Sequence, residues 1–233
     1  MEYTDREIVK RAVGDRPDDA HKGTMGTLLS VCGSYGMAGA CLLSGAAALR
    51  SGIGLLKCAL PKSIYPIAAC RMLESVYLPL DENADGRTAV SNLPVLLEQK
   101  ADAVMLGCGL GVCDDTRELV RGFTARCRKP MILDADALNC IAGDPSVLRN
   151  AHAPIIITPH PMEMARLTGL TAAEVNADRV KTAREFAARC GVIVVLKGAG
   201  TVTAAPDGMA YNGAKTMIKV ENVSKSYELD DGN

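Results

Sequence analysis

The sequence contains no tryptophan, and aromatic residues make up only 3% of its 233 residues. Proteins that bind single-stranded nucleic acid stack the bases on aromatic side chains, so this shortage argues against such a function. Positive charge is not in excess either, because 26 Lys and Arg residues face 27 Asp and Glu residues and give a net charge of -1. A double-stranded nucleic-acid surface needs a basic excess. We therefore expect no nucleic-acid partner.

No two cysteines are separated by just two residues, although the chain has nine of them. This spacing excludes a zinc ribbon and a thioredoxin-type motif. Several cysteines, such as Cys32, lie in apolar runs and are typical of small buried hydrophobic residues. Because unpaired thiols are usual in reducing compartments, we predict a cytoplasmic location.

Long apolar segments are also missing. The most apolar stretch, Met37 to Leu49, is too short to cross a bilayer. The charged residues after Met1 do not form the apolar region of a signal peptide. We expect no membrane association. The remaining composition, 48% hydrophobic and 23% charged, is ordinary for a globular protein.

Short apolar runs alternate with helical patterns along the chain. The sequence predicts strands at Leu28–Cys32, Gly54–Ala59, Ala103–Leu106, Met131–Asp134, Ile155–Thr158, Ile193–Leu196 and Thr201–Ala204. It predicts helices at Ala38–Ser51, Lys62–Arg71, Leu93–Glu98, Asp115–Arg126 and Ala172–Arg189, with a short one after the capping-box pattern at Thr4. Continuous apolar strands between helices indicate a single α/β domain with a mostly parallel sheet and helices on both faces.

Two glycine-rich turns each follow a predicted strand. The first runs from Gly33 to Ala40 and opens a helix, and the second runs from Gly107 to Gly111. Turns of this kind point free N–H groups at a ligand beyond the strand ends. Ala40 and Gly109 would then allow the closest approach to the backbone. Close packing of an Ala/Gly helix and a simple tight turn explain the same residues equally well.

Asp134 and Asp136 stand at the end of a predicted strand. Residues i and i+2 of an extended chain share a face, so both carboxylates can face one crevice. Carboxylate oxygens suit Mg²⁺, usually with bound waters. The alternative is that Asp136 caps the next helix and Asp134 accepts a backbone hydrogen bond.

His160 lies between Pro159 and Pro161, which restrict the backbone on both sides. It is the best placed of the three histidines to hydrogen-bond a ligand. Glu163 can pair with a substrate or a bound water. The alternative is a capped turn with an exposed histidine.

A lysine and a turn of small residues end another predicted strand. The turn consists of Lys197, Gly198, Ala199, Gly200 and Thr201. Lysine supplies a point charge and the glycines supply N–H groups, which together suit a nucleotide phosphate. The pattern is not a Walker A loop.

Taken together and in their order along the chain, the segments described above resemble those of the ADP/ATP-dependent NAD(P)H-hydrate dehydratases. These are ribokinase-like proteins that repair hydrated nicotinamide cofactors. The matching segments are His21-Lys22-Gly23, Gly33-Ser34, Gly36 to Ala40, Ala47 to Gly52, Gly107 to Gly111, Leu133 to Asn139, Thr158 to Met164 and Leu196 to Thr201. The resemblance implies an α/β, ribokinase-like three-layer sandwich.

The resemblance also implies a site and a reaction. The hydrated dinucleotide would lie against Ala40, Gly109 and His160, and the nucleotide on Lys197, Gly198, Ala199, Gly200 and Thr201. ADP or ATP would phosphorylate the ring hydroxyl with Mg²⁺ present, and loss of phosphate would restore the double bond. Members of this family tend to form homo-oligomers, which we also expect here.

Two positions depart mildly from the family pattern. Cys108 replaces a usual proline, and Met162 replaces a usual glycine where it can crowd His160. A larger departure follows Gly213, where the family continues into a Gly-Ser-Gly-Asp run whose aspartate is the catalytic base. This run is absent from the printed sequence. We therefore predict an incomplete family domain at residues 1–213, with its C-terminal part missing and no catalytic residue of its own.

Residues 214–233 read as an unrelated tail. From Met217 they resemble the start of an ABC-transporter ATP-binding subunit, with Tyr227 at the position that stacks on adenine. The alternative is a polar tail that adds one strand. A general base contributes about 10²–10⁴ to a rate and an anion-hole donor about 10²–10³. The sequence thus leaves three hypotheses: a dehydratase with weak activity, a ligand-binding remnant without catalysis, and a small-molecule hydroxyl kinase of the same fold.

Overall fold

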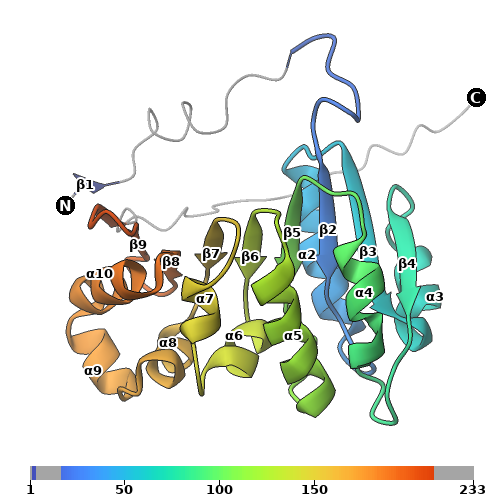
Figure 1. The fold of residues 1–233 in the computed structure, drawn as a ribbon. Coiled ribbons are helices and arrows are strands. Elements are labelled where there is room, and N and C mark those ends of the chain that lie inside the picture. The colour runs from blue at the N-terminus through green and yellow to red at the C-terminus, as the bar shows by residue number, and fades with distance from the viewer. Residues whose placement is uncertain (1, 4–16, 213–233) are drawn as a thin grey trace, which may run out of the picture.

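The computed structural model describes residues 2–3 and 17–212. The helix predicted after Thr4 and the predicted tail at residues 214–233 lie outside the described residues. Within them, ten strands form one sheet in the order β1-β10-β9-β8-β7-β6-β5-β2-β3-β4 (Figure 1). The strands from β8 to β4 are parallel, whereas β9 runs antiparallel to both β8 and β10. The prediction of a mostly parallel sheet is therefore confirmed.

Each predicted strand is present, with small shifts at its ends. The strands are β1 Glu2–Tyr3, β2 Thr27–Val31, β3 Leu55–Pro61, β4 Val76–Leu80, β5 Ala103–Leu106, β6 Met131–Leu133, β7 Ile155–Ile157, β8 Ile193–Leu196, β9 Val202–Ala204 and β10 Ala210–Asn212. The sequence did not predict β1, β4 and β10. Strand β4 pairs with β3 at one edge of the sheet, and β10 is a three-residue strand that pairs with β9.

The helices agree with the sequence less closely. They are α2 Ala38–Arg50, α3 Tyr65–Ala69, α4 Leu93–Leu97, α5 Asp114–Arg126, α6 Asp136–Ile141, α7 Ser146–Arg149, α8 Pro161–Thr168, α9 Ala172–Ala177 and α10 Arg179–Cys190. The prediction of one helix over Ala172–Arg189 is wrong. The chain breaks at Asp178, which has a non-helical backbone and caps α10 by accepting a hydrogen bond from the Lys181 N–H.

Two apolar cores lie on opposite faces of the sheet. Figure 1 shows α4, α5 and α6 in front of the sheet and α2 behind it. The larger core fills the side of α5, α8 and α10 and includes Phe123 and Phe186. The smaller core joins α2 and α3 to β2 and β3, through residues such as Cys41, Leu56 and Ile64. The molecule therefore has the three layers expected of this fold class.

One row of apolar side chains is only partly covered. Met105, Ile132, Ile156 and Ile193 are aligned across β5, β6, β7 and β8. Each is partly exposed, whereas the residues beside them on the same strands are buried. This row leaves an apolar strip on one face of the sheet in the described part of the chain.

The parallel strands bring the predicted site residues together. Gly33, Gly107, Asp134, Thr158 and Lys197 all lie at or just beyond the carboxyl ends of their strands. In a parallel sheet these ends share one edge, where ligands bind in open α/β folds. None of the helices in residues 17–212 is long and apolar enough to span a membrane.

Candidate ligand site at the carboxyl ends of the strands

The two glycine-rich turns are packed against each other. The Gly33 N–H donates to the Cys108 carbonyl at 2.8 Å, and the Ser34 hydroxyl donates to the Gly109 carbonyl at 2.9 Å. A Cβ at Gly109 would lie 2.6 Å from the Ala40 Cβ, and Gly109 has a φ of 66°. Both the space and the backbone conformation therefore require glycine here. The structure places the predicted pair Ala40 and Gly109 in direct contact.

Lys197 is the cation at the centre of the strand ends. Its Nζ lies 2.7 Å from Oδ1 of Asp134 and 4.0 Å from Oε2 of Glu163. Burial raises the pKa of Asp134, but hydrogen bonds from Lys197 and Thr158 outweigh burial and leave that pKa below its usual value. Glu163 is only 5% exposed. One ammonium group therefore holds two carboxylates from β6 and α8 at the site.

The second aspartate has a different partner. Asp136 is the first residue of α6, and its Oδ2 accepts a hydrogen bond of 2.9 Å from the Gly111 N–H. Between the two aspartates, Ala135 has a φ of 51° and a ψ of −116°. A non-glycine residue in such a conformation is strained by about 1–3 kcal/mol, and such strain is concentrated at functional sites. Because Ala135 is not extended, Asp134 turns to Lys197 while Asp136 fixes the second glycine turn.

His160 begins α8 as its N-cap. Its Nδ1 accepts hydrogen bonds from the N–H groups of Met162 and Glu163, at 3.1 and 3.3 Å. The Glu163 carboxylate in turn accepts from the His160 N–H at 2.8 Å and lies 3.3 Å from its Nε2. The reciprocal capping box fixes the ring at the strand end. His160 remains 45% exposed, so part of its ring is accessible to a ligand although Nε2 faces Glu163.

The Lys197–Thr201 turn is held by a residue that the sequence analysis missed. Arg179, the first residue of α10, donates to the carbonyls of Leu196 and Lys197 at 2.8 Å each and to that of Ala199 at 3.3 Å. Burial lowers the pKa of Arg179. The Thr201 hydroxyl adds a bond of 3.1 Å to the Gly198 carbonyl. The predicted nucleotide residues therefore form one braced turn at the end of β8.

Cys108 links the glycine turn to the charged centre. Its thiol lies 3.7 Å from Oδ2 of Asp134 and is a hydrogen-bond partner of the Cys32 thiol. That bond lowers the pKa of Cys32 to about 7, against the opposing effect of burial, and it raises the pKa of Cys108. All nine cysteines are free.

The loop that contains Gly86 and Arg87 borders the two glycine-rich turns, although the sequence did not predict it as part of the site. The Gly86 carbonyl accepts a hydrogen bond of 2.9 Å from the Tyr35 N–H. The Arg87 side chain occupies the space that a Cβ at Gly111 would need. Tyr35 in the first glycine turn and Met162 beside His160 are both exposed. No sequence motif marked the loop.

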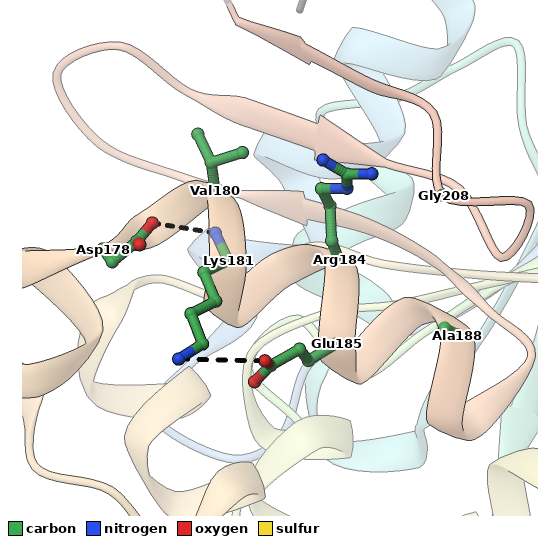
Figure 2. Close-up of a pocket in the computed structure, with 7 residues that line it drawn as sticks. All are labelled: Asp178, Val180, Lys181, Arg184, Glu185, Ala188 and Gly208. Atoms are coloured by element: carbon green, nitrogen blue, oxygen red, sulfur yellow. Dashed lines mark hydrogen bonds and ion pairs between the residues drawn. The ribbon is translucent and has the colours of Figure 1, made fainter.

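A separate hollow lies on the outer side of α10. Figure 2 shows it between this helix and the turn at Gly208, with Arg184 directed toward the turn and Lys181 beside Glu185. Its volume is about 520 Å³. None of the predicted site residues lines it. We therefore place the candidate site at the strand ends and not in this hollow.

A family model described as NAD(P)H-hydrate dehydratase matches residues 28–225. A bifunctional NAD(P)H-hydrate repair enzyme from Moorella thermoacetica is 41% identical over 198 residues, which are 84% of this chain and 37% of that protein. An ADP-dependent (S)-NAD(P)H-hydrate dehydratase from Neisseria meningitidis is 37% identical over 199 residues, covering 84% of this chain and 64% of that protein. The chain thus spans less than two thirds of the length of these curated relatives.

The fold also matches a solved structure. The crystal structure of an ADP/ATP-dependent NAD(P)H-hydrate dehydratase from Bacillus subtilis, co-crystallised with ATP and Mg²⁺, has a TM-score of 0.76 and 31% identity. The match covers 91% of this chain and 72% of that one. A ribokinase-like protein from Enterococcus faecalis, at 21% identity and a TM-score of 0.76, has the same fold.

Proposed function

This chain belongs to the NAD(P)H-hydrate dehydratase family, and from that premise we propose that its strand-end site binds hydrated NADH or NADPH together with ADP or ATP. The observation that carries the proposal is the pairing of Lys197 with Asp134 at 2.7 Å, beside the braced glycine turn of β8. Lysine and free N–H groups suit a nucleotide phosphate. Ala40, Gly109 and His160 leave accessible backbone and one imidazole edge for the hydrated ring.

The proposed reaction removes water from the ring through a phosphorylated intermediate. The ring hydroxyl oxygen attacks the terminal phosphorus and loses its proton to solvent, and the nucleotide leaves one phosphate shorter. The ring nitrogen lone pair then expels phosphate, and a proton leaves the adjacent carbon to complete the double bond. Phosphate is a far better leaving group than hydroxide. Such a transfer depends on positioning and charge stabilisation more than on covalent help from the protein.

Each proposed contact has a defined task. Lys197 would neutralise phosphate charge, and the Gly198–Gly200 backbone would donate hydrogen bonds to phosphate oxygens. His160, fixed by Glu163, would orient the hydrated ring through the exposed part of its imidazole. A side chain at Gly109 would clash with Ala40, so the hydrated ring would lie against a surface of two small residues.

We propose Mg²⁺ as the accompanying ion. The described residues contain no group of three or more metal-ligating side chains. This suits a cation held mainly by nucleotide phosphates, with one or two carboxylates in support. Asp134, which lies 2.7 Å from Lys197, and Asp136, which accepts from the Gly111 N–H, would supply these carboxylates. When bound, Mg²⁺ would neutralise charge on the phosphates.

Calorimetric titration tests the binding proposal. We expect hydrated NADPH and ADP each to bind the chain, and sugar or vitamin alcohols not to displace the hydrated dinucleotide. If such alcohols bind and the hydrated dinucleotide does not, the site is that of a small-molecule hydroxyl kinase instead. If neither the nucleotide nor the hydrated dinucleotide binds, the proposal is wrong.

Self-association and location are also proposals. The apolar row of Met105, Ile132, Ile156 and Ile193 supports a homo-oligomer, because exposed apolar surface of this kind favours association. Light scattering that gives a monomer would contradict it. The nine free thiols support a cytoplasmic location.

A further inference from the structure

Arg179 occupies a position that is costly for a cation. It is the first residue of α10, where the positive end of the helix dipole disfavours a positive charge. Its side chain is partly buried, and its Nε is buried without a partner among the described residues. Neither feature is expected of a surface arginine whose charged group is simply solvated by water. The three hydrogen bonds to one turn offset this cost.

The carbonyls that Arg179 holds determine where the N–H groups of the turn point. The peptide bonds of the described residues are trans. In a trans peptide, the C=O of one residue and the N–H of the next point in opposite directions. Arg179 holds the carbonyls of Lys197 and Ala199. The N–H groups of Gly198 and Gly200 are therefore directed away from the guanidinium.

These two N–H groups are available for a ligand. In the part of the chain that the structure describes, neither takes part in a backbone hydrogen bond. Gly198 and Gly200 have φ values of 142° and 69°, which favour glycine. A Cβ at Gly198 would overlap the guanidinium of Arg179. Arginine and glycine at these positions are thus mutually dependent.

We propose that Arg179 is a positioning residue, which turns the Gly198 and Gly200 N–H groups toward the phosphates of the bound nucleotide. It touches neither substrate nor nucleotide itself. The inference rests on the proposed function, since it needs a nucleotide in the Lys197–Thr201 turn. Backbone N–H groups held in this way form an anion-binding concavity.

The test compares two ligands on the same variants. In Arg179→Ala the turn loses its brace, so the Kd for ADP should rise by about tenfold to a hundredfold, the effect of losing one or two charge-assisted hydrogen bonds. The Kd for hydrated NADPH should stay within about twofold, because its proposed contacts lie on other turns. Arg184→Ala on the same helix is the matched control, since Arg184 is exposed and is directed toward the turn at Gly208, not the Lys197–Thr201 turn. It should leave both Kd values unchanged.

A conservative variant and a second perturbation keep the test decisive. Arg179→Lys should restore ADP binding only in part, because one ammonium cannot serve three carbonyls in the fixed geometry of a guanidinium. Gly198→Ala should weaken ADP binding as Arg179→Ala does, and it serves if Arg179→Ala fails to fold. Wild-type ADP affinity in both Arg179→Ala and Gly198→Ala overturns the inference but leaves the proposed function intact. No ADP binding by the wild type rejects the proposed nucleotide turn and the inference with it.

Discussion

Replacement of Lys197 by methionine should separate ligand binding from stability at the strand ends. Methionine keeps much of the side-chain length but removes the charge that faces Asp134 and Glu163. If Lys197 contacts a phosphate, the loss of one charge-assisted interaction costs about 1.5–3 kcal/mol of binding free energy. The Kd for ADP should therefore rise by about 10- to 150-fold.

The same substitution should destabilise the fold by a smaller amount. It leaves Glu163, which is 5% exposed, and Asp134, whose side chain is 26% exposed, without their cation. Removing one partner of a fully buried pair costs about 3–5 kcal/mol, and an exposed pair contributes about 0–1 kcal/mol. Because Lys197 is 41% exposed, we expect a loss of about 1–2 kcal/mol in the free energy of unfolding.

The pH dependence gives an independent check. The pKa of Asp134 is lowered in the folded state, so this carboxylate contributes stability above its unfolded pKa, and the contribution is lost as pH falls through the folded pKa. Without Lys197 the folded pKa should rise, and acid unfolding should begin at a higher pH. Urea unfolding across the acid range measures this shift.

Two further variants make the Lys197 prediction refutable. Lys181→Met removes an exposed lysine of α10 and should change neither ADP affinity nor acid stability. The double variant Lys197→Met with Asp134→Asn removes the unpaired charge, so it should recover part of the stability while ADP binding stays weak. If Lys197→Met binds ADP as tightly as Lys181→Met does, Lys197 is not a phosphate contact and the reasoning fails.

The remaining predictions concern the neighbouring turns. His160→Ala should lose the helix cap and about 1 kcal/mol in the free energy of unfolding, whereas His160→Asn should keep the cap. Both variants should bind hydrated NADPH more weakly by calorimetry. Wild-type binding by His160→Asn would show that the imidazole does not contact the ligand. Gly109→Ala should cost about 1–3 kcal/mol in urea unfolding and abolish hydrate binding, because its φ is positive and Ala40 is too close; retention of both would contradict that close approach. Thiolate absorbance of the wild type should include an ionisation of Cys32 at about pH 7, because the Cys108 thiol lowers the pKa of Cys32. Cys108→Ala should move that step to higher pH, and an unchanged titration would disprove the thiol pairing.

The sequence was sufficient for the parts of the fold that depend on local pattern. Apolar runs such as Ile155–Ile157 and Ile193–Leu196 were predicted because buried parallel strands are continuous and apolar. Strand β4 was missed because Pro79 and an exposed Val76 interrupt that pattern at the sheet edge. The sequence predicts one continuous helix across Asp178 because the apolar spacing of α9 continues into α10.

The prolines around His160 were also misleading. They were read as a stiff loop, although Pro161 is the first residue of α8, where proline is well tolerated. The signal that could have identified the helix was Glu163 three residues after His160, the spacing of a capping box. A capped turn with an exposed histidine was the alternative interpretation, and in the structure the histidine itself is the cap, although Ser, Thr, Asp and Asn are the usual residues there.

Contacts between residues from different strands and turns could not be predicted from the sequence pattern. The contact between Lys197 and Asp134 joins residues 63 positions apart, and the one between Gly109 and Ala40 depends on how α2 packs against a turn from β5. The sequence marked all four residues as candidates because small or charged residues follow apolar strands. Arg179 carried no such mark, since an arginine at the start of an amphipathic helix is ordinary in sequence. Its role depends on the position of β8, which only the folded chain defines.

The central claim is that the strand-end site binds the hydrated dinucleotide and the nucleotide at the same time. The most direct measurement is calorimetric titration of the purified 233-residue chain with hydrated NADPH, alone and with saturating ADP and Mg²⁺, and with ADP beside the Lys197→Met variant. We expect hydrated NADPH to bind in both of its titrations, and ADP to bind the wild type about 10- to 150-fold more tightly than Lys197→Met. Loss of hydrated NADPH binding when ADP is present, or ADP binding that Lys197→Met does not weaken, would contradict the claim.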